Sequence, residues 1–326
     1  MVRRIFLTLA LALLVPLSAV AATKRVPLGI YATAGCDGVK HVEEFAKWFG
    51  RKPDLVVDFV TWDIVKEGSH WVLGCWRDAG QKQLVLSLPM LPDDGSATLA
   101  DGAAGKFDQM FRDYAATIIR FGFADAVLRI GWEFNGDWYP WAASKDPESY
   151  KSYWRRIVTA MRSAPGAKFR FDWNMDGGWT NFMPEEAYPG DAYVDIIGVD
   201  LYNIVWNKDM DTPEGRWNFY LTQRRGLNWV RDFAAAHGKP ISFPEWGTGK
   251  QPSGGGGDDP YFIEQMAQWI RSNHVAYHAY WDHTGGFNAR LSNGKQPLAG
   301  AAFKRVFHDN VPKSPAPLIV AGEKAR

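Results

Sequence analysis

Residues 126–134 read AVLRIGWEF, a short apolar run that passes into a loop rich in Trp and Gly. Runs of this length, rich in Val, Ile and aromatic residues and bounded by turn residues, predict buried strands. The same kind of run recurs along the chain and brings the number of expected strands to about eight, as a parallel barrel requires. The other seven runs lie at residues 26–31, 54–60, 83–88, 168–174, 193–202, 239–246 and 275–281.

Amphipathic segments alternate with these runs, and the spacing of their apolar residues predicts helices. They lie at Phe107–Phe121, Pro147–Met161, Trp217–His237 and Pro260–Asn273. The third segment is expected to end at Gly238, because glycine commonly caps helices. Strands and helices that alternate in this way over 326 residues predict an α/β fold, a single (β/α)8 TIM barrel. A doubly wound sheet is the competing architecture, but no GxGxxG or Walker sequence marks a ligand crevice for it.

The first 22 residues have the pattern of a signal peptide. Arg3 and Arg4 precede an apolar stretch at residues 5–15, and the small residues around Ala21 suit a signal peptidase. Because the apolar stretch is too short to span a bilayer comfortably, we expect export to the periplasm or the outside, without a membrane anchor after cleavage. A retained anchor is the alternative.

The rest of the chain is expected to form one catalytic domain at residues 23–310 and a peripheral tail at 311–326. The tail sequence VPKSPAPLIVAGEKAR contains prolines spaced so that a helix cannot form until late in the segment. No composition change within 23–310 calls for a second domain, and we expect a monomer.

The charge balance excludes some classes of partner. Lys and Arg total 37 and Asp and Glu total 36, so no long-range field exists to collect nucleic acid or an anionic membrane. A neutral substrate fits this balance better.

The two cysteines, Cys36 and Cys75, leave two possibilities open. In an oxidising compartment they could form one disulfide between the first and second strand–helix units. They could equally be two unpaired buried thiols.

Two glutamates stand at expected strand ends beside aromatic residues. Glu133 ends the fourth run and Glu245 ends the seventh, KPISFPEW. In a parallel barrel the functional side chains gather at the carboxyl ends of the strands. A pair of carboxylates from two different strands, among indole rings, is what breaking a glycosidic bond requires. We therefore predict that these two glutamates form a catalytic pair.

Counting by twos along the strands predicts which side chains face the barrel interior. Polar residues on that side indicate a site, since an inert core would hold Val, Ile or Leu. The alternative is structural: Arg129 would pair with Asp172 and Asp200 in a buried ion network, and the two glutamates would be exposed charges. The interior positions expected on the fourth, sixth and seventh strands are Arg129, Gly131, Glu133, Gly198, Asp200, Tyr202, Ile241, Phe243 and Glu245.

The chain has 16 tryptophans, many of them in segments expected to overhang the barrel mouth. Indole faces stack on the C–H faces of sugar rings, so exposed tryptophans at the mouth predict sugar contacts. Many of the 16 will pack in the core or within loops. We predict sugar contacts for Trp138 and Trp281, and also for Trp62.

Three segments, in order along the chain, resemble glycoside hydrolase family 26. RIGWEFNGDWYPW is similar to the acid/base segment of that family, with an Arg on the strand, a Glu, then Asn-Gly and a Trp. YPGDAYVDIIGVDLYN resembles the sixth-strand segment and PEWG the nucleophile segment. One departure stands out: the family has His immediately before the acid/base, and this chain has Trp132, whose indole can donate a hydrogen bond but cannot accept one.

The resemblance implies a role for each matching residue. It implies Glu133 as general acid/base, Glu245 as nucleophile and Tyr202 as hydrogen-bond partner of the nucleophile. The other residues expected to support or contact the sugar are Arg129, Trp132, Asn135, Trp138, Asp200 and Trp281.

The resemblance also implies retention of configuration, which requires two carboxyl groups ~5–5.5 Å apart. The expected function is an endo-acting retaining β-glycanase, with β-mannan or a β-1,4-linked or mixed-linkage glucan as substrate. Trimming of a bacterial exopolysaccharide is another possibility, and a carbohydrate-binding protein on a hydrolase-like barrel is an alternative from a different class. Neither a cofactor nor a metal is expected, since His274, His278 and His283 do not form a facial metal set with a carboxylate.

Overall fold

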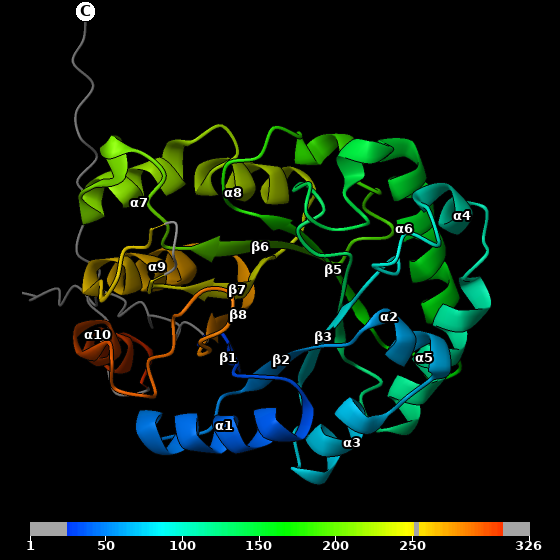
Figure 1. The fold of residues 1–326 in the computed structure, drawn as a ribbon, viewed down its shortest axis with the longest axis horizontal. Helices are drawn as coiled ribbons and strands as arrows, with labels where there is room; N and C mark the ends of the chain where they lie inside the picture. The colour runs from blue at the N-terminus through cyan, green and yellow to red at the C-terminus, as the bar shows by residue number, and fades with distance from the viewer. Residues whose placement is uncertain (1–24, 251–253, 309–326) are drawn as a thin grey trace, which may run out of the picture.

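The computed structural model describes residues 25–250 and 254–308, and their strands form a closed barrel. Every neighbouring pair is parallel, and β8 closes the ring by pairing with β1. Figure 1 looks down on this ring, with the helices around its outside. The strands are β1 (Leu28–Tyr31), β2 (Leu55–Phe59), β3 (Leu84–Leu88), β4 (Val127–Ile130), β5 (Arg170–Asp176), β6 (Ile196–Tyr202), β7 (Ile241–Gly247) and β8 (Val275–Trp281).

These eight strands match the eight apolar runs, so the (β/α)8 barrel prediction is confirmed. The ten described α-helices are α1 (Gly35–Phe49), α2 (Trp62–Glu67), α3 (Trp71–Asp78), α4 (Leu99–Ala103), α5 (Asp108–Arg120), α6 (Pro147–Arg162), α7 (Pro213–Thr222), α8 (Leu227–Ala236), α9 (Pro260–Ser272) and α10 (Pro297–Phe307). Short 3-10 turns lie at Ala143–Lys145, Pro184–Ala187 and Lys208–Met210.

The prediction of one helix over Trp217–His237 was wrong, because the chain breaks there into α7 and α8. The turn between them brings Gly226 close to the preceding helix: a Cβ on this glycine would lie 2.4 Å from the carbonyl oxygen of Tyr220. The absence of a side chain is therefore what allows this tight turn. The expected end at Gly238 is confirmed by its left-handed backbone, with φ of +63°.

The barrel interior is layered from apolar to polar. Leu55, Val85, Val127 and Ile196 belong to a small buried cluster contributed by several strands. Above it Asp172 accepts hydrogen bonds from Ser242 Oγ at 2.6 Å and Tyr277 Oη at 2.5 Å. The larger apolar cluster, which includes Trp154, Phe243 and Trp246, fills the space between barrel and helices. The polar side chains of the barrel interior therefore lie above the small apolar cluster, towards the mouth.

The predicted alternation on β7 was wrong for Ile241 and Phe243. Ser242 faces the interior, whereas Phe243 packs edge-on against Trp269 of α9, with ring centroids 5.3 Å apart. Ile241 belongs to the same outer cluster. The register of β7 shifts against both neighbours between Phe243 and Trp246, which is a β-bulge. This irregularity brings Glu245 to the interior despite its odd spacing from Ser242.

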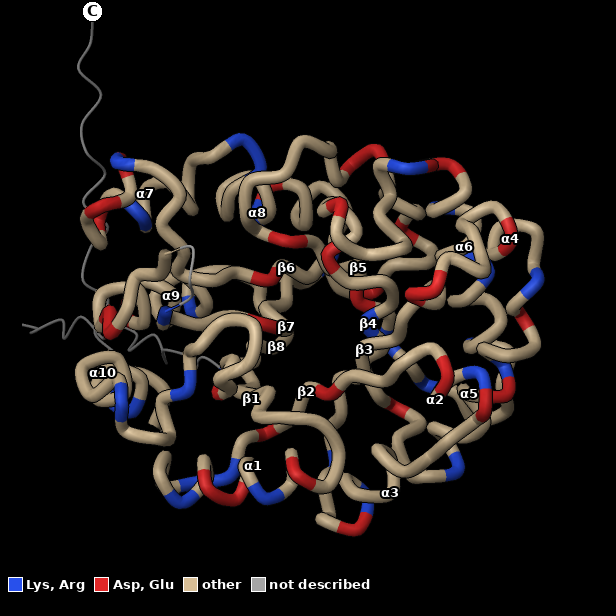
Figure 2. The backbone as a smooth tube through the Cα atoms, viewed as in Figure 1, with Lys and Arg blue, Asp and Glu red and all other residues tan. Residues whose placement is uncertain are grey.

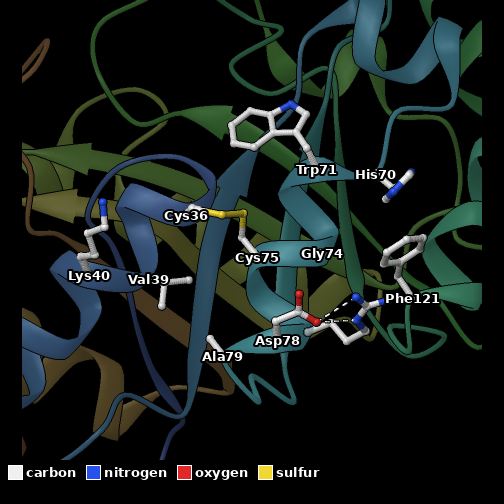
Figure 3. Close-up of a pocket in the computed structure, with 11 residues that line it drawn as sticks. Cys36, Val39, Lys40, His70, Trp71, Gly74, Cys75, Asp78, Ala79 and Phe121 are labelled. Carbon is white, nitrogen blue, oxygen red and sulfur yellow. Dashed lines mark hydrogen bonds and ion pairs between the residues drawn. A yellow bond between two sulfur atoms is a disulfide. The ribbon is translucent and has the colours of Figure 1, made fainter.

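Cys36 and Cys75 form a disulfide, so the alternative of two free thiols does not hold. The bond joins α1 to α3, and the two Cα atoms lie 4.9 Å apart. Figure 3 shows the bond at the edge of a surface groove, with the half-exposed indole of Trp71 nearby.

The expected signal peptide at 1–22 and tail at 311–326 lie outside the described residues. Within the described part of the chain, every helix is too short or too polar to cross a bilayer.

Candidate active site

Charged side chains gather at the carboxyl ends of the strands. Figure 2 shows acidic positions at the inner ends of β5, β6 and β7 and a basic position at β4, all around the centre of the ring. The basic residue is Arg129, and the three acidic strands carry Asp176, Asp200 and Glu245. Charged residues of four strands thus lie together at the carboxyl ends of the strands, as expected for the functional end of a parallel barrel.

Arg129 is the hub of this cluster. Its guanidinium is fully buried, and its Nη2 forms ion pairs with Asp200 and, at 2.6 Å, with Glu245 Oε1. Nε donates to Asn174 Oδ1 at 2.8 Å and Nη1 to Ser87 Oγ at 3.1 Å. The two carboxylates hold the pKa of Arg129 above its ordinary value against the effect of burial. Arg129 therefore lies in a buried ion network, as the structural interpretation expects, and one of its partners is the predicted nucleophile.

Glu245 lies on β7 with both oxygens engaged. Oε1 pairs with Arg129, and Oε2 accepts a hydrogen bond of 2.6 Å from Tyr202 Oη. Its backbone N–H donates to Asp200 Oδ1 at 3.1 Å. These contacts fix the position of the carboxylate at the end of β7.

Glu133 lies just beyond β4, in a strained turn. Among the described residues it is the one non-glycine residue with positive φ, +52°, and its N–H donates to the carbonyl oxygen of Asn174 at 2.9 Å. Gly131 has φ of +51°, so two left-handed residues bend the chain. Strain of this kind in the left-handed region is typical of functional sites. Trp138 Nε1 then donates to Glu133 Oε2 at 2.9 Å.

The surroundings of Glu133 favour its protonated form. Burial raises its pKa well above the ordinary value, and the charges of Asp176 and Glu245 raise it further. Arg129 and the Trp138 hydrogen bond act in the opposite direction. The charge of Glu245 therefore acts on Glu133, although the two side chains have different partners. Glu245 forms an ion pair with Arg129, whereas Glu133 is bonded by the Trp138 indole.

Aromatic rings form the wall of the mouth. Trp281 stacks on Tyr31, with centroids 4.3 Å apart, and lies edge-on to Tyr202 at 5.9 Å. Its indole N–H donates to the carbonyl oxygen of Phe287 at 3.0 Å, which fixes the ring. Trp138 is 52% exposed. Trp138 thus bonds Glu133 directly, and Trp281 contacts Tyr202, which bonds Glu245.

The predicted sugar contact of Asn135 has no support from its neighbours, because its amide is hydrogen-bonded within the protein. Nδ2 donates to the carbonyl oxygen of Asp176 at 2.9 Å and to Thr180 Oγ1 at 3.2 Å, and Oδ1 accepts from the Asp176 N–H at 2.8 Å. Asn135 instead holds the β4 loop against the end of β5.

Trp62 is the first residue of α2, and its ring packs edge-on against Phe107 at 5.1 Å and Phe111 at 6.3 Å. These contacts do not join its ring to either glutamate. A sugar contact for this residue stays a prediction without support from its neighbours.

Sequence reasoning missed Ser87, Asn174 and Asp176. Asn174 bonds both Arg129 and, at 3.1 Å, Asp200 Oδ1. The alternation of polar residues in the β5 segment FRFDWNMD would have predicted all three of Asp172, Asn174 and Asp176 as interior residues.

His278 and His283 are engaged in packing and hydrogen bonds, and His274 is exposed. Burial lowers the pKa of His278 to about 3, and its ring packs against Trp246 and Phe307. His283 Nδ1 lies 2.6 Å from the carbonyl oxygen of Ala32. Within residues 25–250 and 254–308, no three His, Cys, Asp or Glu side chains are grouped as metal ligands.

Comparison with known proteins agrees with this geometry. The family model for glycosyl hydrolase family 26 matches residues 124–220, which include β4, Glu133, Asp200 and Tyr202. Endoglucanase H of Acetivibrio thermocellus is 30% identical over 252 residues, 74% of this chain and 26% of that protein. Mannan endo-1,4-beta-mannosidase of Bifidobacterium adolescentis is 28% identical over 247 residues, 68% of this chain and 23% of that protein.

The chain belongs to glycoside hydrolase family 26. It spans about a quarter of the length of these two curated relatives. Its fold agrees with that of a family 26 β-mannanase from Bacteroides ovatus, with a TM-score of 0.62 at 16% identity over 88% of this chain and 89% of the other.

This family 26 chain fills the position before Glu133 with a packed Trp132 in place of His. The Trp132 ring lies against Phe59 at 5.2 Å and Trp141 at 4.8 Å, and its N–H donates to Tyr139 Oη at 2.9 Å. Because its only donor is used, Trp132 contributes packing to the wall and has no hydrogen bond left for a sugar.

Proposed function

We propose that this family 26 member is a retaining endo-β-glycanase, with Glu133 as acid/base and Glu245 as nucleophile. The observation that carries the proposal is the contrast between the two carboxyl groups. Glu245 is held by Arg129 and Tyr202, whereas Glu133 has a raised pKa and a single indole donor. A double displacement needs one ionised and one protonated carboxyl group at the start.

In the first step, a Glu245 oxygen attacks the anomeric carbon while Glu133 gives its proton to the departing glycosidic oxygen. The bond from Tyr202 keeps the attacking carboxylate in place. Once the ester has formed, the negative charge of Glu245 is gone and the pKa of Glu133 falls. Glu133 can then remove a proton from water, and the resulting hydroxide releases the sugar from Glu245.

We propose a β-mannan or a β-1,4-linked or mixed-linkage glucan as substrate. The support comes from the names of the two relatives, one a mannosidase and one an endoglucanase. Exposed Trp138 and the fixed Trp281 are the proposed sugar platforms, and a bacterial exopolysaccharide with β-linked neutral sugars would fit the same rings.

We further propose that the protein works outside the cytoplasm as a monomer. The Cys36–Cys75 disulfide supports export, because such bonds persist in oxidising compartments.

Glu133→Gln and Glu245→Gln test the assignment against β-mannan, glucans and bacterial exopolysaccharides, with released reducing ends as the readout. Each variant should lower kcat by about 10²–10⁴-fold or more, whereas Glu148→Gln on the exposed side of α6 should not change it. An aryl glycoside whose leaving group needs no proton separates the two roles. Glu133→Gln should still release that aryl group, and Glu245→Gln should not.

A carbohydrate-binding protein on the same barrel is the alternative from another class. It predicts no reducing ends from the unmodified protein, and only modest loss of affinity in either variant. Release of reducing ends that both variants retain at the original rate would contradict the assignment of the glutamates.

A further inference from the structure

A third carboxylate, Asp176, lies at the mouth and has no part in the roles proposed above. Asp172, Asn174 and Asp176 alternate along β5, and the side chains of Asp172 and Asn174 contact interior groups of the barrel. The same alternation directs Asp176 inward, one layer closer to the mouth. Its Cα pairs with that of Asp200 on β6, so it stands beside the strand that carries Asp200 and Tyr202.

The backbone ties Asp176 to the loop of Glu133. Asn135 bonds both the N–H and the carbonyl oxygen of Asp176, and the Glu133 N–H bonds the carbonyl oxygen of Asn174. The two acids therefore sit on adjacent, mutually bonded segments. Asp176 Oδ2 accepts from the Gly178 N–H at 2.9 Å, and among the described residues no Lys or Arg forms an ion pair with it.

We propose that Asp176 is a positioning residue whose negative charge, held at the mouth beside the loop of Glu133, keeps Glu133 protonated until the glycosidic oxygen takes the proton. The inference rests on the proposed function for its consequence in catalysis, and on the geometry of β4 and β5 for the placement of the charge. A negative charge near a carboxyl group makes ionisation of that group more costly, so Glu133 retains a proton that a lone carboxyl group would lose.

Electrostatics supports this role. Burial raises the pKa of Asp176 to about 7, with a contribution from Glu245, and the charge of Asp176 is the largest single charge effect on Glu133. The other groups that act on Glu133 come from the strands around it. They are Arg129 on β4, Glu245 on β7, Asp200 and Tyr202 on β6, and Trp138 and Tyr139 in the loop after β4.

The same charge would also serve the second step. When Glu133 has given its proton to the leaving oxygen, the bond from that oxygen to the anomeric carbon has broken and Glu245 has become a neutral ester. Glu133 is then an anion beside Asp176, and the repulsion between them favours uptake of a proton from the attacking water. Asp176 acts through Glu133 and needs no contact with the sugar.

A purely structural role is the competing explanation, in which Asp176 only caps the Gly178 N–H. Asp176→Asn separates the two, because the amide oxygen can still accept that bond while the charge is lost. Asp137→Asn is the matched control: Asp137 lies in the same loop as Glu133 but is exposed, so solvent screens its charge. Asp176→Glu keeps the charge.

The test is a ¹³C NMR titration of the carboxyl carbons, in which Glu133→Gln identifies the Glu133 signal. We expect Asp176→Asn to lower the titration midpoint of Glu133 by about one pH unit or more, while Asp137→Asn leaves it in place and Asp176→Glu keeps it high. A midpoint within about 0.3 units of the unmodified protein in Asp176→Asn would overturn the proposal, given that a like-charge neighbour shifts a pKa by more than this.

If Asp176→Asn does not fold, Asp176→Ser takes its place, since the Ser hydroxyl can also accept the Gly178 bond. The titration needs no turnover, so its outcome is independent of the proposed function. An inactive protein with the expected titration would refute the enzyme proposal alone. An active protein in which the titration midpoint of Glu133 does not change when residue 176 is substituted would refute this inference alone. In an active protein, the alkaline limb of kcat/KM should move down with the midpoint.

Discussion

At the scale of single residues, the site depends on one buried cation. Arg129 pairs with Asp200 and Glu245, and its remaining donors bond Asn174 and Ser87. Burying a charge is costly unless it is paired and its donors are satisfied, and here four partners on four other strands satisfy them. The arrangement stabilises the barrel end and fixes the position of Glu245 at the same time.

Tyr202→Phe tests the hydrogen bond to the proposed nucleophile. The change removes the 2.6 Å bond to Glu245 Oε2 but keeps the ring contacts with Trp281 and Phe287. We expect kcat/KM to fall by about 10–100-fold, since a bond to a charged group contributes about 1.5–3 kcal/mol. Steady-state kinetics on the preferred glycan gives the measurement.

The control is Tyr188→Phe, which removes a hydroxyl bonded to Asp191 on the outer surface. Its kcat/KM should not change. A Tyr202→Phe variant as active as this control would show that the bond has no part in catalysis.

The sequence predicted the charged residues of the site better than its amide and indole residues. Period two along a strand sufficed to find Arg129, Asp200 and Glu133, because charged residues in a barrel interior are unusual. Whether a polar side chain is free for a ligand depends on its partners in space, which sequence spacing does not reveal. Asn135 and Trp62 are examples: the first is hydrogen-bonded to β5 and the second packs on α5, and neither contact could be foreseen from the sequence.

At the scale of elements, the turn after β4 aims Glu133 into the mouth. Gly131 has φ of +51°, and a Cβ there would lie 2.4 Å from Met90 Sδ and 3.3 Å from Trp141. Only glycine meets both demands, a left-handed backbone and no side chain.

Gly131→Ala tests this turn, with Gly68→Ala as the matched control. Gly68 has a similar φ, +66°, but a Cβ added there would meet no atom within 4 Å. We expect Gly68→Ala to cost about 1 kcal/mol of unfolding free energy. Gly131→Ala should cost about 1–3 kcal/mol more through overpacking, and kcat should fall with it because Glu133 is displaced.

Urea unfolding of both variants supplies the comparison. Equal losses of stability in Gly131→Ala and Gly68→Ala would mean that Met90 and Trp141 move aside freely. The turn would then not be a rigid support for Glu133.

The eight strands were predictable because each is a short apolar run, but irregularities within elements were not. The β7 bulge reverses which side chains face inward between Ser242 and Glu245, and a strict alternation cannot anticipate it. The break between α7 and α8 likewise follows from the close approach of Gly226 to Tyr220, a contact specific to the folded chain.

At the scale of the whole molecule, one covalent link supports the first part of the barrel. The Cys36–Cys75 bond spans 39 positions in sequence and ties α1 to α3. The cysteine count left this pairing open, because spacing alone does not show that two thiols meet.

Reduction of this disulfide should lower the free energy of unfolding by about 3–4 kcal/mol. This is the contribution expected from the lower entropy of an unfolded chain that is closed into a loop of this length. Thermal unfolding with and without dithiothreitol measures the effect, and the double variant Cys36→Ser with Cys75→Ser is the control. Dithiothreitol should lower the Tm of the unmodified protein and leave that of the double variant alone. If dithiothreitol does not change the Tm of the unmodified protein, the disulfide does not provide the expected stabilisation.

Glu133 and Glu245 are proposed to act on one sugar by double displacement. Proton NMR of the first product from a β-linked oligosaccharide, recorded before mutarotation, is the most direct test of this mechanism. We expect the new reducing end to appear first as the β-anomer, since two inversions at the anomeric carbon restore its configuration. A product that appears first as the α-anomer would rule out double displacement, because it would mean a single direct attack by water.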